Sequence, residues 1–211
     1  MMNRRKYQIP AIFLAMSLLL SACGGKENAA ATMHLFKTEG TVQVNDAKGK
    51  SVEIMENLGL YSGYGVSTQE SSYGWINLDD AKLAKLDEGS EAEVRKDGKL
   101  LELHVQQGSL FFNVAKPLEE DESMDIRTST MMVGIRGTCG WVEVEDENLM
   151  RVYLLRGKVV CSILDKKGGT LVSQELAAGE TATMTLDEKE ASITIAAFDA
   201  GGIPDFVTEE I

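Results

Sequence analysis

The sequence predicts an all-β fold, a single domain of short antiparallel strands arranged as a sandwich or a rolled sheet. Three observations after Ala31 predict it: apolar and polar residues alternate with a period of two, glycine interrupts the alternation often, and sustained helical spacing is absent. Because alternate side chains of a strand face opposite sides of a sheet, each segment should turn one face to a core and the other to water.

The clearest strands, in chain order, are 41–44, 75–78, 101–105, 151–154 and 193–195. The strongest turn signal is Asp97-Gly98, between 91–95 and 99–105, because a two-residue hairpin loop with positive φ at both central positions tolerates this dipeptide. Weaker turn signals lie at 45–50, 79–80, 145–148, 165–169 and 187–190. This strand spacing is typical of a sandwich or a rolled sheet.

The first 22 residues have the pattern of an export signal. Three cationic residues at 4–6 precede an apolar stretch at 9–22, which ends in small residues before Cys23. A transmembrane helix needs roughly 20 apolar residues, whereas this stretch is shorter and contains Pro10. We therefore expect a cleaved signal peptide rather than a retained membrane span.

The residues Leu20-Ser21-Ala22-Cys23 resemble the signal of bacterial lipoproteins, which implies a diacylglyceryl group on the sulfur of Cys23. Each buried acyl methylene contributes about 0.8 kcal/mol, so two long chains hold a protein on a membrane almost permanently. We expect a lipoprotein anchored to the outer face of the cytoplasmic membrane, or to an outer membrane where the organism has one. An ordinary cysteine in a plain signal peptide is the alternative.

We expect the chain to divide into a signal peptide at 1–22, a lipidated tether at 23–31, a β domain at 32–165, additional β hairpins packed on it at 166–197, and a C-terminal tail at 198–211. The tail should form a short helix over 203–211 with Pro204 in its first turn. The part after the tether is long enough for one substantial core.

Net charge argues against a nucleic-acid partner. Removal of residues 1–22 leaves 18 cationic and 33 acidic side chains, a formal net charge of −15. Such a surface repels polyanions and cannot release counterions from a phosphate backbone. Solubility alone accounts for the acidity.

Three sequence blocks occur in a fixed order in the second half of the chain: Gly108-Ser-Leu-Phe-Phe-Asn-Val114, Ile126-Arg-Thr-Ser-Thr130 and Val133-Gly-Ile-Arg-Gly-Thr138, followed by Gly157-Lys158-Val159-Val160. Together they resemble the FecR domain family, whose hallmark is a G-x-L/F-x-x-V strand, a T-P/S-T segment and a V/I-R-G-T turn. Looser similarity at 40–44 and 58–68 extends the resemblance over 33–164. It implies an all-β extracytoplasmic module that binds proteins or envelope components and has no catalytic residues of its own.

The segment Arg136-Gly137-Thr138 has two interpretations. In the structural one, Gly137 supplies a tight or left-handed backbone position, Thr138 begins a strand and Arg136 bonds nearby carbonyls or an acid. In the functional one, Arg136 contacts a carboxylate of a partner. The structural interpretation is favoured, because arginine forks commonly hold loops together.

Cys139 and Cys161 remain once Cys23 is lipidated, and an oxidising compartment favours a disulfide between them. In a flat meander of 138–144, 149–155 and 158–164, the outer strands would lie about 9.6 Å apart, too far for that bond. The disulfide therefore requires a curled sheet or a chain that changes sheets. Two buried thiols are the alternative.

Other polar residues favour neither catalysis nor metal binding. His104 alternates with apolar neighbours and should face solvent, and His34 lies near the tether. The acidic stretches at 79–80 and 119–122 lack calcium-loop spacing and are interpreted as solvated loops. Tyr61 and Tyr64 flank a glycine in a loop-like segment, where exposed rings could stack on sugars or anchor a protein interface.

These observations predict a membrane-anchored, non-enzymatic FecR-like module that binds or senses a protein partner in the cell envelope, as a scaffold or in signalling, with no cofactor and no metal. A module that binds the cell wall or a polysaccharide is the alternative. An enzyme is disfavoured because the sequence contains no nucleophile elbow, phosphate-binding glycine loop or metal-ligand spacing.

Overall fold

The computed structural model describes residues 33–79, 81–188 and 190–211, most of which lie in strands. The predicted signal peptide, Cys23 and the tether lie outside the described residues. The strands are β1 (Met33–Glu39), β2 (Val42–Asn45), β3 (Ser51–Val52), β4 (Leu58–Leu60), β5 (Tyr64–Thr68), β6 (Tyr73–Asp79), β7 (Lys82–Leu86), β8 (Glu91–Asp97), β9 (Leu100–Val114), β10 (Ser123–Arg127), β11 (Met131–Ile135), β12 (Cys139–Asp146), β13 (Leu149–Arg156), β14 (Lys158–Leu164), β15 (Thr170–Ala177), β16 (Glu180–Leu186) and β17 (Ala191–Ala197). The prediction of an all-β fold is confirmed.

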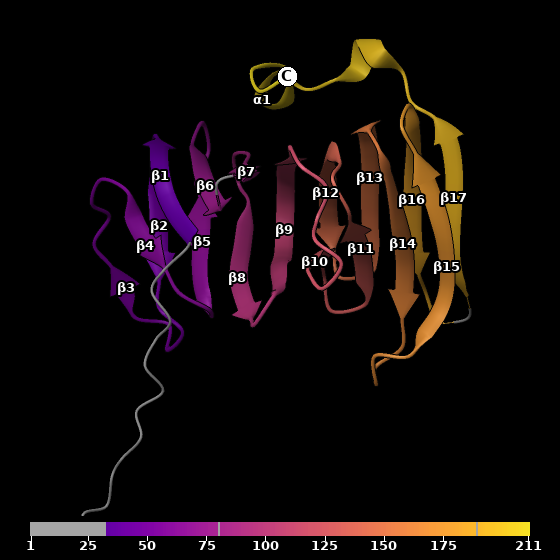
Figure 1. Cartoon of the computed structure of the whole chain (residues 1–211), viewed down its shortest axis with the longest axis horizontal. Coiled ribbons are helices and arrows are strands. Elements are labelled where there is room, and N and C mark those ends of the chain that lie inside the picture. The colour runs from indigo at the N-terminus through magenta and orange to yellow at the C-terminus, as the bar shows by residue number, and fades with distance from the viewer. Residues whose placement is uncertain (1–32, 80, 189) are drawn as a thin grey trace, which may run out of the picture.

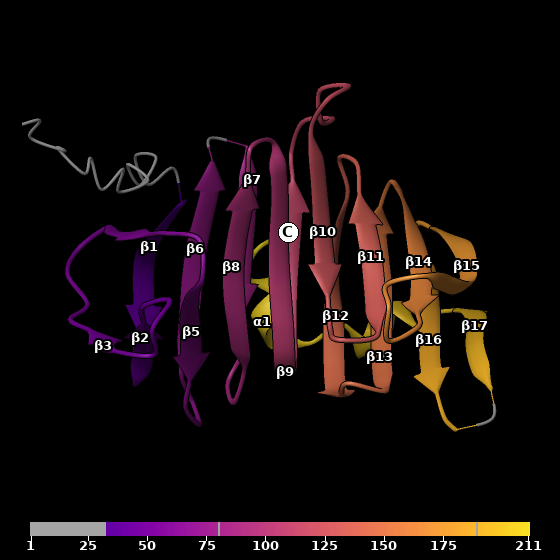
Figure 2. The same ribbon diagram turned by 90° about the horizontal axis from the view of Figure 1, so that it is seen from below.

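The strands form two layers that progress along the long axis of the molecule from the indigo to the yellow end (Figure 1). Sheet A has the order β4-β1-β6-β7-β9-β12-β13-β16-β17. Sheet B has the order β3-β2-β5-β8-β9-β10-β11-β14-β15. Figure 2 shows strands of sheet B side by side in the nearer layer. Among the described pairs, β9 and β10 run parallel and the others antiparallel.

Strand β9 belongs to both sheets. Its residues 100–107 pair with β8 in sheet B, and its residues 108–114 pair with β7 and β12 in sheet A. The chain passes between the sheets at Gly108, which has φ +86° and whose absent Cβ would lie 2.5 Å from Cα of Ser90. Only glycine fits this combination of positive φ and close backbone approach.

The main core fills the space between the layers. Residues of period two from both sheets point into it, including the fully buried Ile76 and Phe112 of sheet A and Leu103 and Val133 of sheet B. Burial of these side chains supplies the main driving force of folding.

The predicted hairpin at 91–105 is present, but its loop lies one residue later than predicted. Asp97 ends β8 and pairs with Leu100, so that Gly98 and Lys99 form the loop. Gly98 has φ +59°, whereas Lys99 is not among the described residues with positive φ. Positive φ at the first central residue alone is the type II′ pattern, and glycine at that position satisfies it.

The chain after β17 crosses the outside of sheet A, as Figure 1 shows. It forms the short 3₁₀ helix η1 (Ala200–Gly202) and the helix α1 (Asp205–Thr208), with Pro204 as the N-cap residue of α1. No helix of the described residues is long and apolar enough to cross a bilayer.

One expectation about sheet A is wrong. We expected each strand to turn one face to water, yet the outward-facing Trp75, Phe111 and Trp141 are buried. Phe206 and Val207 of α1 pack into the same cluster as Phe111 and Trp141. Sheet A therefore has apolar contacts on both faces, and the C-terminal segment provides the cover of the outer one.

Candidate functional site

The segment Arg136-Gly137-Thr138 carries the chain from β11 in sheet B to β12 in sheet A. Gly137 has φ +90°, and a Cβ there would lie 3.0 Å from Cα of Pro117. Thr138 is buried, and its carbonyl accepts a hydrogen bond of 2.9 Å from the amide of Val114 on β9. Gly137 and Thr138 thus join the two layers at a position where the backbone is closely packed.

Arg136 differs from its two neighbours. Its side chain is exposed, and within the described residues it has no hydrogen-bond or ion-pair partner. The contacts with carbonyls or an acid expected from the structural interpretation are therefore not found there. The guanidinium is free to bind a group outside the described chain.

Arg136 lies at a hollow of about 450 Å³ on the outer face of sheet B. The hollow follows a cross-strand row in which Asp125, Gly134, Val160 and Glu175 are direct neighbours on β10, β11, β14 and β15. A Cβ at Gly134 would meet nothing closer than 3.7 Å, so the glycine leaves room at the centre of this row. We call this site the glycine hollow; its lining includes Asp125, Gly134, Arg136, Lys158, Val160 and Glu175.

Charges of both signs surround the glycine hollow. Burial raises the pKa of Asp125, and Arg127 opposes that rise. Lys158 pairs with Glu175 at 2.7 Å on an exposed part of the rim. The hollow therefore offers an unpaired cation, a destabilised carboxylate and an exposed ion pair that a partner could replace. These groups suit hydrogen bonding and ion pairing with another polypeptide.

A buried polar network adjoins the glycine hollow on β8, β9 and β10. Glu102 is buried and accepts hydrogen bonds from Arg127 at 3.0 Å and from Arg95 at 3.4 Å. His104 is half-buried rather than solvent-facing as predicted, and its Nδ1 is buried without a hydrogen-bond partner in the described chain. Burial lowers the pKa of His104. The alternation of residues 101–105 could not show that arginines from both neighbouring strands would cover Glu102.

Residues 65–160 match the FecR protein family. The match covers the family blocks at 108–114, 126–130, 133–138 and 157–160, together with the glycine hollow, except Glu175. It begins at residue 65, after the looser block at 40–44 and within the looser block at 58–68. Within the matched residues, the Arg-Gly-Thr motif forms the connection between the two sheets.

Two crystal structures from Parabacteroides distasonis, at 1.65 and 2.50 Å resolution, share this fold and are described as a "putative anti-sigma factor". Each is 20% identical to this chain with a TM-score of 0.53, over 64% of this chain and 60% of that chain. This chain thus spans less than two thirds of the length of those proteins. No curated protein matches this chain.

The predicted disulfide is not formed in this structure. Cys139 and Cys161 are free thiols, both buried, with Cys139 on β12 of sheet A and Cys161 on β14 of sheet B. Cys161 lies in the main core between the layers, whereas Cys139 lies in the cluster on the outer side of sheet A. The chain does change sheets between the two residues, but the thiols face different clusters.

Tyr61 and Tyr64 precede and begin β5, outside the FecR match. Their rings contact each other edge to face, with centroids 5.5 Å apart. Both residues are half-buried, and Tyr64 packs against the main core. This packing reduces the ring surface that a sugar could stack on.

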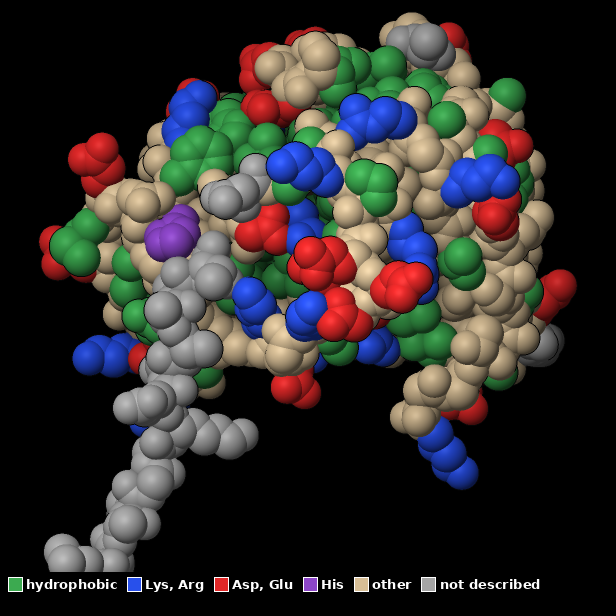
Figure 3. Space-filling model, viewed as in Figure 1, with side chains coloured by type: hydrophobic (Ala, Val, Ile, Leu, Met, Phe, Trp, Pro, Cys, Tyr) green, Lys and Arg blue, Asp and Glu red, His purple; other side chains and the backbone are tan. Residues whose placement is uncertain are grey.

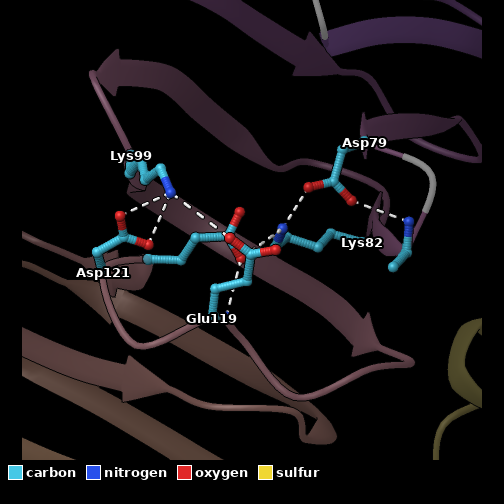
Figure 4. Close-up of polar contacts among 7 residues, drawn as sticks. Asp79, Lys82, Lys99, Glu119 and Asp121 are labelled. Carbon is cyan, nitrogen blue, oxygen red and sulfur yellow. Dashed lines mark hydrogen bonds and ion pairs between the residues drawn. The ribbon is translucent and has the colours of Figure 1, made fainter.

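The fold brings together the two acidic stretches that we interpreted as solvated loops (Figure 4). Lys82 pairs with Asp79 and lies 3.7 Å from Glu122, while Lys99 lies 2.7 Å from Asp121. Figure 3 shows positive and negative side chains intermingled across the middle of this face. Within the described residues, no group of three or more His, Cys, Asp or Glu side chains is placed to hold a metal ion. The lysines make this cluster an ion-pair network.

The sequence did not indicate the most unusual buried charge. Lys85 of β7 lies on the outer face of sheet A with no exposed surface, among aromatic side chains and beneath the C-terminal segment. The alternation of Lys82-Leu-Ala-Lys-Leu86 would place a lysine of this strand in water. Its partners come from more than 120 residues further along the chain, where only the fold could place them.

Proposed function

We propose that this chain is a lipid-anchored, extracytoplasmic module without catalytic activity that binds a protein partner in the cell envelope, in a scaffold or signalling role, through the glycine hollow. The FecR match of residues 65–160 and the fold shared with a protein described as a "putative anti-sigma factor" support a regulatory role. The lipoprotein-like signal before Cys23 supports the anchor.

The observation that carries the proposed binding site is the free guanidinium of Arg136 at the rim of a hollow inside the FecR region. An exposed arginine beside Gly134 can reach a carboxylate on a partner in bidentate geometry, and the hollow can receive the partner's side chain. Interface centres commonly combine an arginine with such a recess.

A photo-crosslinking amino acid in intact cells tests the site. At position 160, where the native valine is 47% exposed inside the hollow, we expect an adduct with one envelope protein. The same amino acid at position 171, where the native leucine is 53% exposed on β15 outside the hollow, is the matched control. Adducts at neither position, or the same adduct at both, would contradict the proposed site.

The role of Arg136 is tested on the same adduct. We expect Arg136→Ala to reduce the yield of this adduct about tenfold, which corresponds to the loss of roughly 1.4 kcal/mol of binding free energy from a charged contact. Arg151→Ala, which removes an arginine of sheet A, should leave the adduct unchanged. Circular dichroism checks that both variants fold.

The lipid anchor needs a separate test. Radiolabelled palmitate should enter the full chain in a lipoprotein-processing host, and Cys23→Ser should abolish both the labelling and the membrane association. Membrane-bound, unlabelled Cys23→Ser protein would contradict the anchor without touching the proposed binding site.

A further inference from the structure

A row of aromatic and cationic side chains crosses the outer face of sheet A. Direct cross-strand neighbours on β1, β6, β7, β9, β12 and β13 place its members side by side in register. We call this set the aromatic row; it consists of Lys37, Trp75, Lys85, Phe111, Trp141 and Tyr153. All of it except Lys37 lies inside the FecR match.

The aromatic row has two chemically different ends. At one end, the ammonium of Lys85 lies 4.7 Å from the centre of the Trp75 ring, and that of Lys37 lies 3.9 Å from the same ring. At the other end, Trp141 and Tyr153 stack at 4.4 Å, and Glu143 accepts hydrogen bonds from both rings. A ligand with carboxylates at one end would bind in one direction only.

The C-terminal segment, residues 203–211, already occupies the row. Phe206 and Val207 are buried in the cluster that contains Phe111 and Trp141. Lys85 donates hydrogen bonds to the carbonyl of Phe206 at 3.0 Å and to Glu209 at 2.9 Å. Hydrophobic side chains gather towards the side of the molecule on which this segment lies (Figure 3).

Few polar contacts attach this segment to the sheets. The indole N–H of Trp75 donates to Glu210 at 2.7 Å, and Glu210 lies 3.3 Å from Lys85. Among the described residues, every polar contact between 203–211 and the strands passes through Lys85 or Trp75. Its backbone-to-backbone hydrogen bonds stay inside the segment, and the carbonyl of Phe206 accepts from the side chain of Lys85. The segment therefore lies on the sheet as a bound peptide would.

We propose that the aromatic row is a docking site for an acidic peptide segment of a partner protein. This peptide has an aromatic and an aliphatic residue, followed within four positions by carboxylates. Residues 203–211 occupy the site until such a peptide displaces them. Charge complementarity selects this ligand, since two lysines flank Trp75 in a chain of net charge −12. The buried ammonium of Lys85 requires an anion or a carbonyl whenever the site is covered. This site lies on the opposite layer from the glycine hollow and does not depend on it.

The test uses a synthetic peptide with the sequence of residues 203–211, labelled with fluorescein at its N-terminus, and the full chain. Fluorescence anisotropy should show weak binding to the wild-type chain, because the tethered segment competes at high effective concentration. In Phe206→Ala, which weakens the tethered segment, binding should tighten about tenfold or more. Adding Lys85→Met to that variant should abolish binding, and so should replacing both glutamates of the peptide by glutamine.

A second variant keeps the proposal testable if Phe206→Ala does not fold. Glu209→Gln with Glu210→Gln keeps both apolar side chains of the segment and should also admit the labelled peptide. Glu53→Gln with Glu56→Gln, on an exposed loop, is the matched control and should bind no better than the wild type. The proposal is overturned if neither opened variant binds the peptide, if Lys85→Met leaves binding unchanged, or if the opened variants instead form dimers by exchanging their own segments.

Discussion

Lys85 and Trp75 are direct cross-strand neighbours on β7 and β6, with the buried ammonium of one 4.7 Å from the ring centre of the other. The charge is stabilised by the face of the ring and by oxygen atoms from the C-terminal segment. These two residues make all the polar contacts that hold residues 203–211 to the strands within the described chain.

Lys85→Met should therefore loosen the C-terminal segment while leaving the two-layered body folded. Methionine fills much of the lysine volume, and the carboxylates that lose their partner can turn to water. We expect carboxypeptidase to remove residues 203–211 several-fold faster than in the wild type, measured by mass spectrometry. Lys82→Met, which removes an ion-paired lysine of the same strand, should not accelerate the digestion.

Acid should release the same segment. The hydrogen bond from Lys85 holds the pKa of Glu209 below its ordinary value of 4.5. A lowered pKa means that this contact stabilises the folded state above pH 4.5 and that the contribution is lost as the pH falls through the lowered value. We expect tryptophan emission to shift to the red below pH 4.5, to a smaller extent in Glu209→Gln. Equal shifts in both proteins would exclude Glu209 as the titrating group.

Asp125→Asn should stabilise the protein at neutral pH. Burial raises the pKa of Asp125, so the ionised carboxylate is less stable in the folded than in the unfolded chain. The gain should be complete above the raised pKa, shrink as the pH falls towards 3.8, and vanish below it. We expect a melting temperature roughly 2 °C higher at pH 7, because an increase of a fraction of a kcal/mol in the free energy of unfolding raises the melting temperature by about this amount. Glu175→Gln, on the exposed rim, should change it little.

Gly137→Ala should destabilise the protein more than Gly168→Ala. Both glycines have positive φ, +90° and +83°, but a Cβ at Gly137 would press on the backbone of Pro117 whereas Gly168 has open space. We expect a loss of about 2–3 kcal/mol for Gly137→Ala and about 1 kcal/mol for Gly168→Ala. Urea denaturation measures the free energy of unfolding of both variants. Equal losses would show that the backbone near Pro117 shifts to accommodate the added Cβ without an energetic penalty.

Neither cysteine of the β domain should react in the native protein. Burial raises the pKa of Cys161 to about 12 and also raises that of Cys139, which keeps both groups as unreactive thiols. We expect no alkylation by iodoacetamide in native buffer and modification of both residues in urea, with or without reductant. If the two cysteines were modified in urea only after reduction, the result would show that they form the disulfide that the sequence predicted.

Period-two alternation predicted strands such as 75–78 and 151–154, and turn residues predicted most of the gaps between them. The same alternation could not assign a strand to a sheet, because β12 and β14 both alternate but lie in different layers. It also could not show that arginines of β8 and β10 cover Glu102, or that Glu210 of the C-terminal segment bonds to Trp75. The alternation within a strand predicts which of its residues share a face. Which other segment covers that face depends on the topology of the whole fold.

The sequence did not predict the glycine hollow, and it placed a possible binding loop at Tyr61 and Tyr64 instead. The Arg-Gly-Thr motif drew attention to residue 136, yet the free guanidinium was expected to be bonded. Nothing local distinguished Lys85 from an ordinary surface lysine. Such residues become visible only when strands far apart in sequence are placed in register.

Because β9 completes both layers, neither layer can melt alone. Separation of the chain into two parts at Gly108 would break the pairing of β9 with β10 in sheet B and with β7 in sheet A, and would leave unsatisfied amides and carbonyls on both parts. The molecule should thus show one cooperative thermal transition, and fragments cut on either side of this strand should not survive as separate folded bodies.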